Sequence, residues 1–246
     1  MTYCVGLLLD NGLVFMSDTR TNAGFDNFSR TRKMFSWDVP GERHITLMTA
    51  GNLATTQALV SLIEERVKGA NDRDPSILRA PSMFQVARHV GSTLKEVIAD
   101  SAPIGPRGDA SSFQATVIVG GQVKGSPPTM FMIYPEGNFI EVTAETPFFQ
   151  IGETKYGRPI LVRAYDSHMS FGDAVKLLLV SFDSTTASNL SVGPPFDLMV
   201  YKNDTFRPEV ELRIEEDDPV YESISNDWGN ALRTAFEQLP TYDLKS

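Results

Sequence analysis

The hydrophobic pattern of the first eighteen residues predicts a β-hairpin. Apolar and β-branched residues run through positions 2–9 and again through positions 13–17. The two runs are joined by Asp10-Asn11-Gly12, a sequence typical of a tight turn between antiparallel strands. Asp18 follows directly after the second run.

The length of that turn decides on which face of the hairpin Asp18 lies. Side chains alternate along a strand, so a shift of one residue moves a side chain to the other face. A two-residue loop with Gly12 as its second residue would pair Asp18 with Val5, on the face opposite Thr2. A three-residue loop with Gly12 in the left-handed conformation would pair it with Cys4, on the face of Thr2. A site that contains the side chains of both Thr2 and Asp18 requires them on the same face, so for such a site we expect the three-residue loop.

The rest of the chain predicts strands and helices in blocks. Helical spacing of apolar residues indicates helices at 53–67, 84–98, 171–186 and 221–238, and a brief one at 159–165. Strands are expected at 31–37, 45–49, 113–120, 130–134, 139–143, 148–152, 197–202 and 210–214, with a loop at 21–30. Helices in separated pairs indicate an α+β order rather than an alternating one. Two antiparallel sheets between two helical layers satisfy this order, although periodicity alone does not select it.

Length and composition favour one globular domain. A chain of 246 residues buries a full core, and no change of composition marks a linker, so we expect a single domain over residues 1–246. Hydrophobic residues make up 41% and charged residues 22%, and no apolar run is long enough to cross a membrane. With no signal peptide evident, we expect a cytoplasmic protein.

Charge and cysteine content exclude further classes. A formal net charge of −9 argues against a nucleic-acid partner. Cys4 is the only cysteine, so an internal disulfide and a zinc ribbon are both excluded. The three histidines have no G-x-S-x-G elbow beside them, and no metal or nucleotide motif occurs. We therefore expect no metal and no cofactor.

Thr2 is the candidate nucleophile. Removal of Met1 would make it the first residue, with a hydroxyl nucleophile and an α-amine base of ordinary pKa about 7.7–8.0 on the same residue. A cation at Lys33 would lower the pKa values of that hydroxyl and amine, and Asp18 would hold Lys33 in place. The alternative is a plain hairpin with a surface ion pair that contributes little.

Met1 decides whether this chemistry is available. While Met1 is attached, the nitrogen of Thr2 is an amide and accepts no proton near neutral pH. We therefore expect activity to scale with the fraction of chains that lack Met1.

Three segments together resemble a known family. They are Ser-Asp-Thr-Arg-Thr-Asn-Ala-Gly at 17–24, Lys33, and Thr-Ala-Gly-Asn-Leu-Ala at 49–54. In this order they resemble the proteasome β-subunit type of N-terminal nucleophile (Ntn) hydrolase. More closely, the chain resembles Anbu, the bacterial proteasome-related family, whose members start directly at Met-Thr. The resemblance spans the whole chain and implies a four-layer αββα sandwich.

The resemblance also implies catalytic roles. Gly51 would offer its backbone N–H to the oxyanion. Asp183 and Thr186 resemble the Asp-x-x-Ser pair that orients the amine, with threonine in place of serine. The Gly-Ser-Gly-Ser element of proteasome subunits is poorly kept at 152–157, where Thr154 is the nearest match.

Substrate contacts are implied in the same way. Arg20 resembles the arginine that pairs with the carboxylate matched to Asp183. A substrate strand would add between residues 21–24 and 51–53 by backbone hydrogen bonds. This edge includes Thr21, Asn22, Asn52 and Leu53, and a side-chain pocket would include Phe25, Leu53 and Thr56.

The leading hypothesis is a self-assembling threonine peptidase that acts on peptides or unfolded proteins. By resemblance, its oligomer would be ring-like and would assemble through the helices. One alternative is an amidase that uses the same nucleophile on small amides. Another is an assembly or binding protein of proteasome fold with little turnover.

Overall fold

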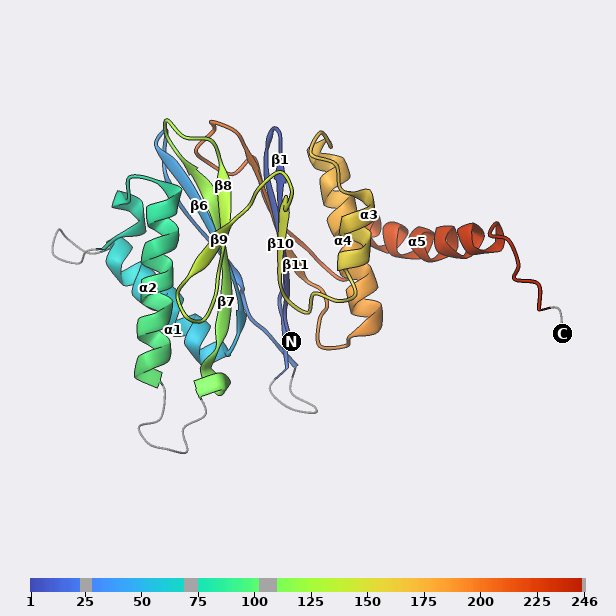
Figure 1. Ribbon diagram of the computed structural model, residues 1–246, viewed down its shortest axis with the longest axis horizontal. Coiled ribbons are helices and arrows are strands. Elements are labelled where there is room, and N and C mark those ends of the chain that lie inside the picture. Colours follow the sequence, from blue (N-terminus) through green and yellow to red (C-terminus); the bar gives the residue numbers. More distant parts are fainter. Residues whose placement is uncertain (23–27, 69–74, 102–109, 245–246) are drawn as a thin grey trace.

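Two five-stranded antiparallel sheets face each other at the centre of the molecule, and helices cover their outer faces (Figure 1). The structure is a computed structural model that describes residues 1–22, 28–68, 75–101 and 110–244. The first sheet has the order β10-β1-β2-β11-β12 and the second the order β5-β6-β7-β8-β9. Helices α1 and α2 cover the second sheet, and α3 and α4 cover the first (Figure 1). The α+β, four-layer αββα prediction is confirmed.

The bounds of the strands are as follows. The first sheet contains β1 (Tyr3–Leu9), β2 (Gly12–Asp18), β10 (Phe148–Gly152), β11 (Phe196–Lys202) and β12 (Val210–Ile214). The second contains β5 (Met34–Val39), β6 (Arg43–Gly51), β7 (Ala115–Val123), β8 (Thr129–Ile133) and β9 (Phe139–Glu141). A separate pair, β3 (Arg20–Asn22) and β4 (Phe28–Arg30), lies where a loop is predicted.

The helices follow the predicted segments closely. They are α1 (Leu53–Lys68), α2 (Met83–Ser101), α3 (Arg158–Ala164), α4 (Phe171–Ser188) and α5 (Pro219–Glu237), with short 3₁₀ turns at Ile77–Arg79 and Ala110–Phe113. The side chain of Asn52 caps α1 by accepting the N–H of Thr55, and Ser170 caps α4 by accepting the N–H of Asp173. Within the described part of the chain, no helix is both long and apolar enough to span a membrane.

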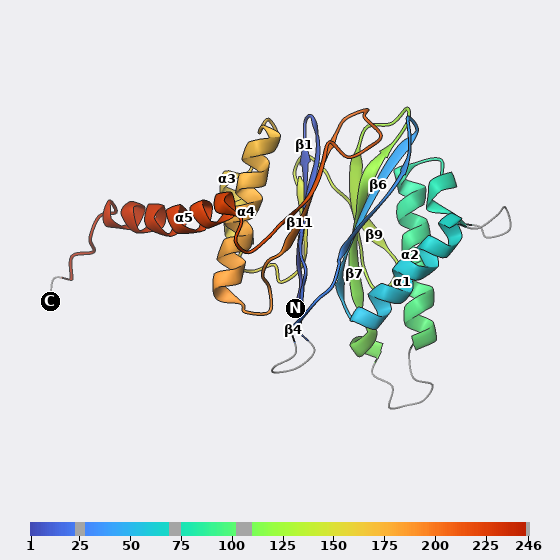
Figure 2. The ribbon, with the colours of Figure 1, turned by 180° about the vertical axis from the view of Figure 1, so that it is seen from behind.

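Helix α5 departs from the layers. It projects away from the sandwich, as both views show (Figures 1 and 2). Tyr221 is the only buried residue of this helix, whereas the side chains of Leu232 and Phe236 are 51% and 75% exposed. Most of this amphipathic helix therefore has no cover within one chain.

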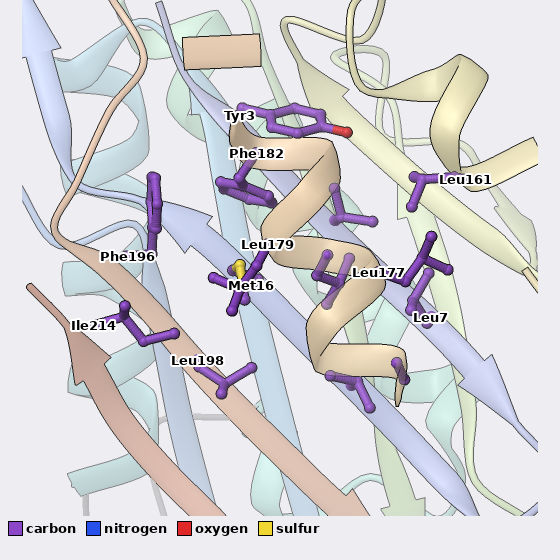
Figure 3. Close-up of a cluster of buried hydrophobic side chains, with 14 of the residues drawn as sticks. Tyr3, Leu7, Met16, Leu161, Leu177, Leu179, Phe182, Phe196, Leu198 and Ile214 are labelled. Atoms are coloured by element: carbon purple, nitrogen blue, oxygen red, sulfur yellow. The ribbon is translucent and has the colours of Figure 1, made fainter. Parts of the chain in front are cut away.

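Three buried clusters hold the layers together. One lies between the first sheet and α3/α4 and includes Tyr3, Leu178, Phe182 and Phe196 (Figure 3). A second packs α1 and α2 on the other sheet, and a third, which includes Cys4 and Phe15, contains residues of both sheets. Because β1 and β2 are covered on both faces, their residues are almost all buried, and both strands read as continuous apolar runs.

The predicted three-residue turn of the first hairpin is wrong. Leu9 pairs with Gly12, so Asp10 and Asn11 alone form the turn, and Cys4 pairs with Ser17. Asp18 is thus level with Tyr3, a register that neither considered loop gives. The physical reason is Gly12, where a Cβ would lie 1.9 Å from the carbonyl oxygen of Tyr201. This glycine is needed for the close approach of β2 to β11, not for the turn.

Candidate active site

The backbone of Thr2 is fixed by the strand beside it. Its carbonyl oxygen accepts the N–H of Glu153 at 2.7 Å, directly after β10 ends. Gly152 has a φ of +85°, and a Cβ at this position would lie 2.0 Å from the same carbonyl oxygen. Only glycine allows this turn and this approach without strain. The first residues of the chain are therefore anchored at one end of the sandwich.

Asp18 and Lys33 form a buried ion pair next to this anchor. The Nζ of Lys33 donates to Oδ1 of Asp18 at 2.7 Å and to the carbonyl oxygen of Arg20 at 2.6 Å. Asp18 is fully buried and Lys33 is 5% exposed. Burial raises the pKa of the Asp18 carboxyl, and the Lys33 ammonium and the N–H of Tyr3 oppose this shift. The pair is part of the interior, not a surface pair.

The Asp18 side chain still contacts the start of the chain, although the hairpin register differs from the predicted one. Because Asp18 is the last residue of β2, its side chain replaces a backbone acceptor at the end of the ladder. Its Oδ1 accepts the N–H of Tyr3 at 2.9 Å. The carboxylate thus links Lys33 to the residue that follows Thr2.

Gly51 ends β6 in a conformation that few other residues adopt. Its φ is +122°, and a Cβ there would lie 2.4 Å from the carbonyl oxygen of Gln114. Asn52 follows and caps α1, so Gly51 stands immediately before the first turn of a helix. This end of a helix carries partial positive charge, which suits a developing oxyanion.

One small cavity brings several predicted residues together. It has a volume of about 40 Å³, and its lining includes Thr2, Thr21, Lys33, Gly51, Leu53 and Thr56. Thr2, the cation and the glycine of the predicted site therefore border the same space. Three larger pockets lie elsewhere, and among their described lining residues the predicted site contributes only Arg20, a predicted substrate contact.

The amine at the start of the chain responds to this environment. The pKa of the Met1 α-amine lies below its ordinary value, first because it is partly buried and second because Lys33 is close. The carboxylates of Asp18 and Glu153 act in the opposite direction. Among the described residues, these three side chains are the charged groups that act on the N-terminus.

Other predicted residues lie apart from the cavity. Asp183 accepts a hydrogen bond from the hydroxyl of Ser225 on α5 at 2.6 Å, and the Thr186 hydroxyl is buried near Tyr221. Arg20 donates to the carbonyl oxygen of Leu190 at 3.1 Å. Among the hydrogen bonds of the described residues, Asp183 is thus linked to α5, and neither Asp183 nor Thr186 is linked to Thr2.

The predicted substrate edge is described only in part. Thr21 and Leu53 line the cavity, whereas the Asn52 side chain serves as the helix cap. Asn22 ends β3, but nothing is described of its side chain. The predicted positions 23–25, which include Phe25, lie outside the described residues.

Sequence reasoning missed Glu153 and Asn189. Glu153 precedes Thr154, which is half-buried, and it is Glu153 that holds the Thr2 carbonyl. The amide of Asn189 donates to Oε2 of Glu153 at 3.0 Å. The only signal was the position of Glu153 directly after a glycine at a strand end. The family element carries hydroxyl groups at this place, so motif matching selects Thr154 instead.

Comparison with known proteins identifies the family. A family model described as proteasome subunit matches residues 2–200. Anbu from Hyphomicrobium sp. strain MC1 is 48% identical, with a TM-score of 0.90 over 98% of this chain and 100% of that one. Anbu (ancestral beta-subunit) from Yersinia bercovieri is 43% identical, with a TM-score of 0.91 over 99% and 100%.

A further solved structure is described as the helical assembly of the Anbu complex from Pseudomonas aeruginosa. It is 43% identical, with a TM-score of 0.90 over 98% of both chains. A search of curated proteins gives no match. With the family model covering most of the chain and near-complete structural matches above 40% identity, the chain belongs to the proteasome subunit family, and within it to Anbu.

Proposed function

We propose that this chain is a threonine-type hydrolase of peptide bonds, with Thr2 as its nucleophile once Met1 has been removed. The observation that supports this best is the single cavity bordered by Thr2, Lys33 and Gly51. A nucleophile, a cation that favours its deprotonated form and a strand-to-helix glycine share one space. This set provides what acyl transfer requires.

In the first half of the reaction, the Oγ of Thr2 attacks the substrate carbonyl carbon. The hydroxyl proton passes to the α-amine of the same residue, and the carbonyl oxygen becomes an oxyanion near the N–H of Gly51. Lys33, held by Asp18, lowers the pKa of the hydroxyl through its charge. When the tetrahedral intermediate collapses, the C–N bond breaks and the leaving amine takes the proton from the α-ammonium.

In the second half, water hydrolyses the ester on Thr2. The α-amine takes a proton from the attacking water, and the ester oxygen leaves as the Thr2 hydroxyl after receiving that proton. Atoms and protons balance over the cycle: one amide and one water give one acid and one amine. No cofactor is needed.

A substrate would lie between Thr21 and Leu53, which flank the cavity. A strand added between them would be held by backbone hydrogen bonds and read through its side-chain pocket. The alternative is a small-amide hydrolase that uses the same nucleophile.

We also propose that the chain self-associates, and that α5 takes part. Its apolar residues have little cover within one chain, and such patches mark interaction sites. The Pseudomonas relative forms a helical assembly. Assembly would also restrict access to a peptide-cleaving site.

Thr2→Ala, compared with the wild type on a panel of peptides and small amides, tests the catalytic proposal. Thr2→Ser is the matched control, since it keeps a hydroxyl on an N-terminal residue. We expect turnover in the wild type and the serine variant, and none in the alanine variant. Equal rates in the alanine variant and the wild type would remove both hydrolase readings and leave an assembly protein of proteasome fold.

A further inference from the structure

Glu153 is a buried carboxylate to which the proposed reaction assigns no role. It is 7% exposed, yet no lysine or arginine forms an ion pair with it among the described residues. Its backbone N–H holds the carbonyl oxygen of Thr2 at 2.7 Å. A buried carboxylate needs a compensating charge or several hydrogen bonds.

Asn189 and the backbone of Lys155 fix the side chain of Glu153, whose Oε1 accepts the N–H of Lys155 at 3.4 Å. Asn189 is the C-cap of α4, and its N–H donates to the carbonyl oxygen of Thr185 at 2.8 Å. Its Oδ1 accepts the N–H of Ser191 at 3.0 Å, which directs its NH₂ group to Oε2 of Glu153 at 3.0 Å. The same amide lies 3.9 Å from the Sδ of Met1. The orientation of the amide is thus set by a donor on one side and an acceptor on the other.

The charges at the N-terminus explain why a carboxylate is useful here. The charged groups that act on the amine are Lys33, Asp18 and Glu153. Asp18 is already engaged by Lys33 and by the N–H of Tyr3. Burial and Lys33 both disfavour an ammonium, yet the proposed reaction needs one to form transiently. Glu153 is the acidic group that remains to compensate it.

We propose that Glu153, held by Asn189, is the positioning residue for the α-amine of Thr2, which it orients and stabilises in its protonated form. This rests on the proposed function, because it assigns a role to the base of that reaction. The amine and the carbonyl that Glu153 holds belong to the same residue, so Glu153 remains next to it after Met1 is removed. Glu153 itself forms no bond to substrate.

The test is the pKa of the Thr2 α-amine, measured without any substrate. Full-length protein that begins at Thr2 is released from a cleavable N-terminal fusion. The pH dependence of acetylation of its amine by trace acetic anhydride is then followed by mass spectrometry of the N-terminal peptide. The variants are Glu153→Gln and Asn189→Ala. Glu145→Gln is the matched control, since it removes the same charge from an exposed loop position.

We expect Glu153→Gln to lower the amine pKa by about one unit or more relative to the wild type, the usual effect of losing an adjacent opposite charge. Asn189→Ala should lower it by less, and Glu145→Gln should leave it unchanged. An amine pKa in Glu153→Gln equal to that in the wild type would overturn the proposal. If Glu153→Gln does not fold, Asn189→Ala decides in its place, and an unchanged pKa in that variant overturns it.

Turnover measurements separate this proposal from the function itself. If Thr2→Ala and the wild type turn over equally while Glu153→Gln lowers the amine pKa, the hydrolase function fails and the placement of Glu153 stands. If Thr2→Ala is inactive and the amine pKa does not respond to Glu153→Gln, the function stands and the role of Glu153 fails.

Discussion

Oδ1 of Asp18 lies 2.7 Å from the Nζ of Lys33 and 2.9 Å from the backbone nitrogen of Tyr3. One carboxylate oxygen therefore holds both the cation of the candidate site and the first strand residue after Thr2. Since both side chains are buried, neither charge has water to replace a lost partner.

The first prediction concerns this pair. Asp18→Asn leaves a buried ammonium without its anion, and Lys33→Met leaves a buried carboxylate without its cation. Each change should lower the free energy of unfolding by about 3–5 kcal/mol and abolish turnover. The double variant should be more stable than the sum of the single changes predicts. Urea denaturation of all four proteins measures this, and additive losses would contradict a coupled buried pair.

Gly51 gives a second prediction. Gly51→Ala forces a side chain into a positive-φ conformation against the carbonyl oxygen of Gln114, a strain of about 1–3 kcal/mol. We expect a lower melting temperature and a loss of turnover, because relief of the strain moves the N–H of residue 51. Gly125→Ala is the control, since φ there is also positive but the space around it is open. If Gly51→Ala keeps wild-type turnover, the N–H of Gly51 is not an oxyanion donor.

The pH dependence of turnover is the third prediction. Partial burial and Lys33 hold the pKa of the Met1 α-amine below its ordinary value. We expect the same two causes to act on the amine of Thr2 once Met1 is removed. The base must be unprotonated, so kcat/KM should rise with pH. The midpoint of the rise should lie below the ordinary amine pKa of about 7.7–8.0. A midpoint at or above that range would show that the amine is not the base, or that Lys33 does not act on it.

The fourth prediction concerns α5. Leu232→Ser combined with Phe236→Ser removes two exposed apolar side chains one helical turn apart. Sedimentation velocity at micromolar concentration should show wild-type species well above 27.2 kDa and smaller species for the double variant. Val162→Ser, at an exposed position of α3, is the control and should not change the distribution. A wild type that sediments as a 27.2 kDa monomer would refute self-association.

Most of the fold could be predicted from the sequence because its signals are local. Helical spacing gave α1, α2, α4 and α5 nearly to their bounds, and apolar runs gave the long strands. The hairpin register could not be predicted in this way. A glycine after Asp10-Asn11 looks like a turn residue, but Gly12 is required by the carbonyl of Tyr201, almost 190 positions later. Short strands such as β3 and β4 depend on each other and leave little pattern.

In the candidate site too, residues in short motifs could be predicted, whereas residues brought together only by the fold could not. Thr2, Lys33 and Gly51 were predicted from short motifs, and they border one cavity. Residue type and spacing predict Asp183, but in the fold its Oδ1 accepts a hydrogen bond from Ser225 on α5. Glu153 and Asn189 are contributed by the ends of β10 and α4, and only the three-dimensional fold brings them together. The spacing of residues along the sequence does not predict a contact of this kind.

The measurement that tests the central claim most directly is turnover against the fraction of chains that begin at Thr2. Preparations that differ only in retention of Met1 are quantified by intact-mass spectrometry and assayed on the same peptide. If the α-amine of Thr2 is the base, the rate should rise in proportion to the Met1-free fraction and pass through zero. Full turnover by a preparation that uniformly retains Met1 would contradict it, because an amide nitrogen at Thr2 cannot accept the proton of its own hydroxyl.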